Sequence, residues 1–182
     1  MHQEIRPAPP PPALDPAPLP ANADTHGGSS NIGVGGNSSS CSTHILRTHR
    51  LSLRFLTLAD APFILSLVND ASWLRFIGDR NVHSLKDAER YLQDGPFAMH
   101  AKHGHSLWAV TLADSGTAIG MCGLLRRDCL RHADVGYALL PQWRGQGYAR
   151  EAAAATLQYG RDALGMKKIV AVCSMDNDRS IR

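Results

Sequence analysis

The stretch from Ala133 to Ser174 constrains the fold more than any other part of the chain. It begins with the apolar run "ADVGYALLP", which ends at a proline, and continues through the glycine turn "WRGQG" into an alanine-rich run. We expect a helix over 150–164, stopped by Gly165, and then a second strand. In a strand-helix-strand unit the two strands are parallel. The sequence therefore predicts an α/β fold with the glycine turn at the carboxyl end of a strand.

The helix and the second strand of this unit carry further predictions. Helical spacing places four residues on the face that packs against the sheet: Ala153, Leu157, Gly160 and Leu164. The strand that follows is "KKIVAVCS", residues 167–174. Cys122 and Cys173 lie in strand-like runs, and we expect both to be buried thiols rather than nucleophiles.

The rest of the predicted sheet comes from upstream runs. Residues 49–58 alternate apolar and polar side chains, which is typical of a strand with one buried face. Three later runs are separated by short connections and are predicted to form an antiparallel meander: 106–113, 117–127 and 133–141. Together with the parallel strand, they predict a mixed, mostly antiparallel sheet with flanking helices.

Two helical segments are expected between the first strand and the meander: 61–70 and 85–94. Asp60 is in the N-cap position of the first helix. Ser84, with Asp87 three residues later, gives the second helix a start resembling a capping box. Gly95-Pro96 interrupts this second helix, which is expected to resume over 97–104.

The composition divides the chain in two. Residues 1–44 are rich in proline, then in glycine and serine, and have almost nothing apolar to bury, so we expect a disordered tail. A passive tail, a start codon placed too early and a docking role for the proline run are alternatives for it. The chain has 182 residues, 43% of them hydrophobic, which suits one domain with a core over 45–182.

Charge and cysteine content exclude several classes of function. The formal net charge is +3 with scattered Lys and Arg, which gives no reason to propose a nucleic-acid partner, while a small anionic ligand fits equally well. The four cysteines form no Cys-x-x-Cys pair, which favours a reducing cytoplasm. No apolar run approaches the roughly 18 residues of a membrane helix, and the N-terminal residues lack the basic-then-apolar order of a secretion signal. The protein is therefore predicted to be cytoplasmic, without membrane association.

The glycine turn has features of an anion site. The first N–H groups of a helix lack internal partners, and the helix dipole adds positive charge there. Gly145 and Gly147 let an anion approach those groups, and Arg144 and Arg150 can add charge. A tight turn without a ligand is an equal alternative on these residues alone. The spacing excludes a dinucleotide fingerprint, which needs a third glycine, and a P-loop, which needs Gly-Lys-Ser or Gly-Lys-Thr.

The residues around this turn resemble the GNAT acetyltransferase superfamily. "QWRGQG", residues 142–147, matches the signature Gln/Arg-x-x-Gly-x-Gly/Ala, and "DVGYALLPQWRGQGYAREA" is similar to the strand, loop and helix around it. "LRTHRLSLRFLTLADA" is similar to the family's first strand and helix, and "SMDNDRSIR" to its Asn-x-x-Ser segment after the fifth strand. The resemblance runs from about residue 45 to the end and is closest to the branch with ribosomal-protein Nα-acetyltransferases.

The resemblance implies that the glycine turn holds the pyrophosphate of acetyl-CoA. It also implies that the end of the fourth strand pairs its backbone with the pantetheine arm. The residues implied in acetyl-CoA binding are Ala138, Leu139, Leu140, Gln142, Arg144, Gly145, Gln146, Gly147, Tyr148, Ala149, Arg150, Asn177 and Ser180.

The implied reaction is transfer of an acetyl group from acetyl-CoA to a primary amine, either a protein N-terminus or a small amine, by direct attack. The amine must be neutral to attack, so a base is useful near neutral pH. Asp134 stands at the family's acidic position in "DVGY" and is the candidate base. The alternative is that Asp134 orients substrate or pairs with an arginine such as Arg126 or Arg131.

The acceptor side has weaker candidates. Trp73 and Phe76, in the segment "ASWLRFIG" that we expect to be irregular, are candidates for a substrate wall, whereas Trp108 is expected in the core. Acetyl transfer needs no metal, and no metal site is predicted at three closely spaced histidines: His100, His103 and His105.

The resemblance also concerns the end of the chain. In the family the Asn-x-x-Ser segment opens a further helix, usually followed by two strands, whereas this sequence stops at Arg182. The resemblance thus implies a GNAT fold truncated after the fifth strand, with an exposed edge that favours homo-oligomers. A non-catalytic coenzyme A-binding remnant or regulatory module, and a module binding acetyl-lysine or a phosphopeptide, remain alternatives.

Overall fold

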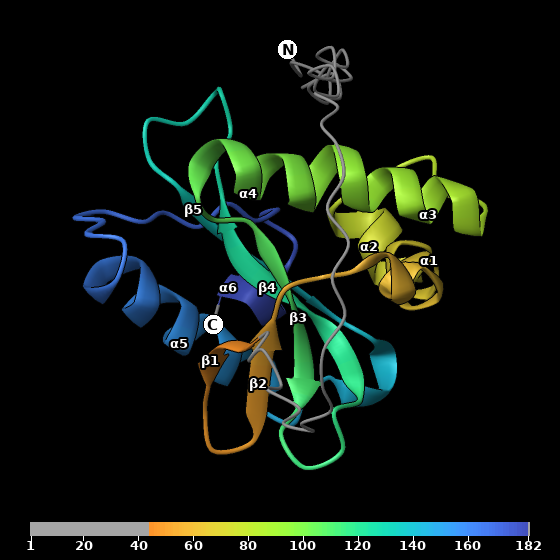
Figure 1. Ribbon diagram of the computed structural model, residues 1–182, viewed down its shortest axis with the longest axis horizontal. Coiled ribbons are helices and arrows are strands. Elements are labelled where there is room, and N and C mark those ends of the chain that lie inside the picture. The colour runs from red at the N-terminus through yellow and green to blue at the C-terminus, as the bar shows by residue number, and fades with distance from the viewer. Residues whose placement is uncertain (1–43, 182) are drawn as a thin grey trace, which may run out of the picture. The chain divides into compact units, whose positions relative to one another are not determined.

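The computed structural model describes residues 44–181, which contain a five-stranded sheet (Figure 1). The strands lie side by side in chain order, and each neighbouring pair is antiparallel. They are β1 (His44–Arg47), β2 (Leu51–Arg54), β3 (Leu107–Leu112), β4 (Ala118–Leu125) and β5 (Asp134–Leu139). The predicted meander of three strands is confirmed, and β5 lies at one edge of the sheet.

Helices cover both faces of the sheet. They are α1 (Ala61–Val68), α2 (Ala71–Phe76), α3 (Leu85–Leu92), α4 (Ala98–His103), α5 (Tyr148–Asp162) and α6 (Asp178–Ile181), with the short turns η1 (Leu58–Asp60), η2 (Gln93–Phe97) and η3 (Pro141–Trp143). None of these helices combines the length and apolar character needed to cross a membrane.

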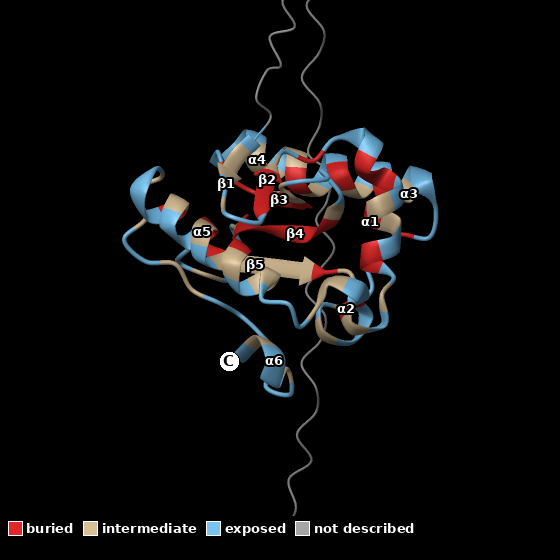
Figure 2. Ribbon diagram, turned by 90° about the horizontal axis from the view of Figure 1, so that it is seen from below, coloured by how far each residue is buried: buried red, intermediate tan, exposed pale blue. Residues whose placement is uncertain are grey.

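Two core clusters lie on opposite faces of the sheet because neighbouring strand residues point in opposite directions. Ala109 packs with α1, α2 and α3, whereas Trp108 and Val110 pack toward α5. Figure 2 shows that buried residues concentrate in β2, β3 and β4, while β5 is mostly intermediate. Trp108 is buried as predicted.

Two short elements were not predicted. Strand β1 begins at His44, which falls inside the expected tail; residues 1–43 lie outside the described part of the chain. With four residues, β1 is too short to show a clear period. The segment expected to be irregular contains α2, because the Asp70 carboxylate accepts hydrogen bonds from the N–H groups of Ser72 (3.0 Å) and Trp73 (3.3 Å).

Of the two predicted helix N-caps, Ser84 caps its helix through its side chain and Asp60 does not. The Asp87 N–H donates to Ser84 Oγ (3.1 Å), so the predicted cap of α3 is confirmed. Asp60 precedes α1 as predicted, but its carboxylate binds Arg54 and does not cap that helix. The interruption at Gly95-Pro96 is the π-helical turn η2, which accommodates a residue without an N–H, and the helix resumes as α4.

The predicted strand over 167–174 is wrong as a continuous element. Only Val170 pairs with β5, in a parallel bridge to Asp134, with hydrogen bonds from Val135 N–H to Val170 O (2.9 Å) and from Val170 N–H to Ala133 O (3.0 Å). The predicted parallel direction holds at this bridge. Beyond it the segment makes no ladder within the described residues, so Cys173 is exposed rather than buried.

The predicted buried face of helix α5 is confirmed in part. Gly160 is buried as predicted and Ala153 packs partly buried against the core, but Ala152 and Thr156 are buried in place of Leu157, which is 38% exposed. The Thr156 hydroxyl is hydrogen-bonded to Cys122 Sγ (3.4 Å), so a polar side chain enters the core with a partner. Cys122 is buried as predicted, and burial raises the pKa of its thiol to about 12. An alanine-rich run has few large apolar side chains, so its period alone does not determine the buried face.

Close backbone packing at Gly123 in β4 yields a stability prediction. A Cβ there would lie 2.0 Å from Ser106 O and 2.7 Å from Leu107 Cα, which are backbone atoms. Gly123→Ala should therefore lower the free energy of unfolding by about 1–3 kcal/mol, measured by denaturant titration. Gly95→Ala is the control, because its Cβ meets nothing within 4 Å and alanine favours helix. Equal stabilities of the two variants would contradict this packing.

Candidate functional site

The glycine turn joins the end of β5 to α5. Gly145 and Gly147 both adopt left-handed backbone conformations, with φ of 75° and 81°, and Gly147 is the N-cap residue of α5. Within residues 44–181, the backbone N–H groups of residues 145–150 have no hydrogen-bond acceptor. The turn thus presents a row of donors at the positive end of a 15-residue helix, which is the arrangement that anion binding requires.

The connection between β1 and β2 holds this turn from one side. Glu151 accepts hydrogen bonds from Thr48 Oγ1 (2.5 Å), from Arg50 N–H (3.0 Å) and from Arg50 Nε (2.7 Å). Arg50 also donates to Gln146 O (3.0 Å), and its guanidinium lies 4.5 Å from the centre of the Tyr148 ring. Burial raises the pKa of Glu151, but these hydrogen bonds outweigh it, so the pKa is lowered. Arg50 and Glu151 were missed from the sequence because 101 positions separate them.

Arg144 holds the turn from the other side. Its guanidinium donates to Leu139 O (2.8 Å) and Ser72 Oγ (2.9 Å) and forms an ion pair with Asp70. Since Asp70 also caps α2, Arg144 connects β5 and the glycine turn to that helix. The sequence suggested that Arg144 adds charge to the anion site, whereas here all three guanidinium nitrogens have partners elsewhere. Arg150 is exposed and forms no ion pair within the described residues.

Part of the outer edge of β5 is open. Val135 uses this edge for the bridge beyond β5, so alternation places the backbone groups of Tyr137 and Leu139 on the same edge. Ala138 and Leu140 direct theirs toward β4. The segment 138–140, which was predicted to pair its backbone with the pantetheine arm, thus lies at the sheet edge. The backbone groups that point outward there belong to Tyr137 and Leu139.

Asp134 lies at the opposite end of β5 from the glycine turn. Its side chain is 1% exposed, and both carboxylate oxygens accept from Arg127 Nε at 3.1 Å. An arginine partner was one of the alternatives, although the arginines named were Arg126 and Arg131. Arg126 instead donates to the Arg131 carbonyl (2.8 Å). At about 3.3 Å per residue, β5 separates Asp134 from the turn by roughly 20 Å.

The candidates for the acceptor side lie around α2. Trp73 is 5% exposed and packs in the core, and its indole N–H has no partner in the described chain. Phe76 is half-buried, with the Arg75 guanidinium 4.8 Å from its ring centre. Arg75 also pairs with Asp176 (3.0 Å), which places the segment before α6 beside α2.

Asn177 and Ser180 lie in the turn that forms α6. The Ser180 N–H donates to Asn177 O (2.9 Å), and the side chains form no hydrogen bond to the glycine turn within residues 44–181. The structure therefore groups these two residues with α2 and leaves them apart from the glycine turn.

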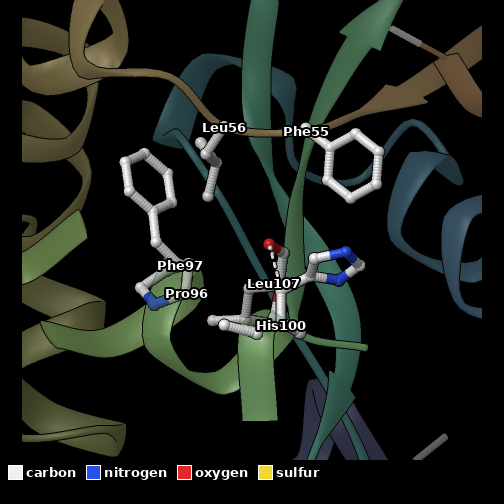
Figure 3. Close-up of a pocket in the computed structure, with 8 residues that line it drawn as sticks. Phe55, Leu56, Pro96, Phe97, His100 and Leu107 are labelled. Carbon is white, nitrogen blue, oxygen red and sulfur yellow. Dashed lines mark hydrogen bonds between the residues drawn. The ribbon is translucent and has the colours of Figure 1, made fainter. Parts of the chain in front are cut away.

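Two cavities lie away from the glycine turn. One, of about 190 Å³, is lined by residues that include Phe55, Leu56, Phe97 and His100 (Figure 3). The His100 ring meets Phe55 edge-on at 4.8 Å, and its Nδ1 is buried without a partner in the described residues. The other cavity, of about 380 Å³, adjoins Ala133.

The fold agrees with comparisons to known proteins. A family model described as an acetyltransferase (GNAT) domain matches residues 50–182. The chain belongs to the GNAT acetyltransferase family. YoaA of Bacillus subtilis (strain 168), an uncharacterized N-acetyltransferase, is 32% identical over 141 residues, which cover 76% of this GNAT chain and 78% of YoaA. The resemblance inferred from the sequence is thereby confirmed.

Solved structures extend the comparison. An acetyltransferase from Agrobacterium tumefaciens str. C58 is 26% identical with a TM-score of 0.66, covering 81% of this chain and 84% of that one. RimL, a ribosomal L7/L12 alpha-N-protein acetyltransferase solved in complex with coenzyme A, has a TM-score of 0.66 at 19% identity, covering 76% and 78%. The similarity to RimL shows a shared GNAT fold.

The ion pair between Asp70 and Arg144 predicts a pH-dependent stability. Burial raises the pKa of Asp70, but the hydrogen bond and charge of Arg144 and the α2 N–H groups outweigh it and lower the pKa. A lowered carboxyl pKa stabilises the fold above the unfolded value, near roughly 4, and this stabilisation is lost as pH falls through the folded value. Asp70→Asn should therefore lower the thermal midpoint more at pH 7 than at pH 3.

The control for this experiment is Asp94→Asn. Asp94 is exposed and forms no ion pair in the described chain, so its substitution should leave the midpoint nearly unchanged at both pH values. A loss in Asp70→Asn that is equal at pH 7 and pH 3 would show that the ion pair contributes nothing specific.

Proposed function

We propose that this GNAT chain transfers an acetyl group from acetyl-CoA to a primary amine, either a protein N-terminus or a small amine, by direct attack. The observation that carries the proposal is the row of N–H groups at residues 145–150, which have no acceptor in the described part of the chain and are opened by two left-handed glycines. A protein with the same fold, RimL, has been solved with coenzyme A. Acetyl-CoA, when bound, supplies an activated acetyl thioester.

The residues around the turn fit the donor. The amides of 145–150 would bind the pyrophosphate, with charge added by Arg150, and a Cβ at Gly147 would intrude where the anion approaches. Gln146 Nε2 donates to Gln142 O (2.9 Å), which shapes the turn. The outward backbone groups of Tyr137 and the outward N–H of Leu139 would pair with the amides of the pantetheine arm, because Leu139 O already accepts from Arg144 Nε.

Arg144 serves the donor site indirectly in this proposal. Because its guanidinium is bonded to Leu139 O, Ser72 and Asp70, we assign it to positioning the turn rather than to contact with phosphate. Asn177, Ser180, Trp73 and Phe76 stay proposed binding residues at the α2 side of the site.

Asp134 is the proposed general base. It takes a proton from the attacking amine directly or through a water molecule, and Arg127 fixes the orientation of its carboxylate through two hydrogen bonds of 3.1 Å. Much of the acceleration would come from holding the two reactants together. No covalent intermediate on the protein is needed.

Substitution of Gly147 tests the donor site. Gly147→Val places a branched side chain at the mouth of the turn and should weaken binding of acetyl-CoA and coenzyme A about tenfold or more in isothermal titration. Gly116→Val is the matched control, because Gly116 is also left-handed, with φ of 69°, but lies in the turn before β4. The control should lose stability without losing affinity. Equal affinities in both variants would remove the phosphate-binding role of the turn.

Asp134→Asn tests the base in a thiol-release assay with a panel of amines. If Asp134 is the base, turnover falls while acetyl-CoA affinity is retained, and the loss shrinks as rising pH deprotonates the amine unaided. A loss that is the same at every pH indicates positioning instead. Coenzyme A binding without thiol release for any amine would favour the alternative of a non-catalytic coenzyme A-binding module.

A further inference from the structure

The larger cavity lies at the end of β5 opposite the glycine turn. Its walls come from the connection between β4 and β5, from the residues just before β3, and from residues 166–168 after α5. Its volume is about 380 Å³, which lies at the small end of the range for pockets that bind small molecules. None of the residues proposed above to bind acetyl-CoA or the acceptor lines this cavity.

Positive charge converges on this cavity without a counter-ion. Arg126, Arg131, Lys167 and Lys168 line it, and no carboxylate does. None of these four side chains forms an ion pair within residues 44–181. The adjacent buried carboxylate, Asp134, is already bound by Arg127. Like charges brought together repel one another, and their field attracts an anion.

Hydrogen bonds hold both walls in place. The Arg126 guanidinium donates to Arg131 O (2.8 Å), which closes the β4–β5 connection. On the other side, Met166 N–H donates to Gly160 O (2.9 Å) and Val170 N–H donates to Ala133 O (3.0 Å). The two lysines lie between these anchored positions, so their convergence on the two arginines follows from the fold.

Three histidines also line this cavity: His103, His105 and His132. His105 is buried, and its Nδ1 is 2.9 Å from Leu124 O. Because a carbonyl oxygen only accepts, this nitrogen carries the hydrogen, and Nε2 of the neutral ring is then an acceptor rather than a donor. The His103 and His105 rings stack with their centres 6.0 Å apart. Burial lowers the pKa of His103, the charges of Lys102, His105 and Arg126 lower it further, and Asp128 raises it.

The ligand that suits this lining is an anion rather than a metal or a nucleic acid. No group of three or more His, Cys, Asp or Glu side chains in the described chain is arranged to hold a metal ion. Nucleic acids are bound along extended basic tracks, whereas these cations line one open pocket. Clustered Arg and Lys side chains bind phosphate groups through charge-assisted hydrogen bonds.

We propose that this basic cavity binds a small phosphate-bearing anion, as a second anion site separate from the glycine turn. The proposal stands whether or not the glycine turn binds acetyl-CoA, because it uses different residues at the other end of β5.

The test uses inorganic pyrophosphate at constant ionic strength and follows the ring resonances of His103, His105 and His132 by NMR. In the wild type we expect shifts that saturate with pyrophosphate concentration. Combining Lys167→Ala with Lys168→Ala should weaken the affinity for pyrophosphate at least about tenfold. The control Lys86→Ala, which replaces an exposed lysine on α3, should leave the affinity unchanged. Gly147→Val, which targets the glycine turn, should keep the shifts. Both cavity lysines are exposed, so the double variant should fold, which its thermal midpoint verifies.

Several outcomes would overturn the proposal. Shifts that grow linearly without saturation, or that chloride reproduces at equal ionic strength, would show general screening only. Unchanged affinity in the double lysine variant would exclude these side chains, and loss of the shifts in Gly147→Val would assign the binding to the glycine turn. If a single-stranded oligonucleotide bound more tightly than pyrophosphate, with an affinity that rises with its length, the ligand of this cavity would be a nucleic acid and not a small anion.

Discussion

The candidate donor site depends on one partly buried set of contacts, the bonding of Arg144 to Asp70, Ser72 and the Leu139 carbonyl. A turn with two left-handed glycines has little side-chain packing of its own, so its conformation must be held by neighbours. The single Arg144 side chain connects this turn both to the end of β5 and to Asp70, the N-cap residue of α2. The planar guanidinium suits this task because its donors point in fixed directions.

A second arginine completes the support from the opposite side. Arg50 bonds Glu151 and the Gln146 carbonyl and lies against Tyr148, so the first turn of α5 is joined to the β1–β2 connection. Both arginines donate to carbonyl, carboxylate or hydroxyl oxygens, and the amides of 145–150 have no hydrogen-bond partner within residues 44–181. The protein thus uses its charged side chains to keep backbone donors available, which preorganises them for an anion.

Strand β5 organises the chemistry along its length. One end leads into the glycine turn, the open edge at Tyr137 and Leu139 follows, and Asp134 with Arg127 stands at the start. Beyond Asp134 lies the basic cavity, formed because Val170 makes a parallel bridge to this same residue. The single bridge therefore leaves most of the β5 edge open and also brings the two lysines to the arginines.

The sequence by itself determined the local elements: the meander, the Ser84 cap, the glycine turn before a helix and the GNAT family, because turn residues and strand periods act over a few positions. Only the tertiary structure decided the buried face of α5, the failure of 167–174 to form a strand, and the partners of Arg144, Asp134 and Glu151. Edge pairing and ion pairs depend on which segments contact each other in the folded chain, and such segments can be 101 positions apart in the sequence. Local sequence patterns cannot predict these contacts.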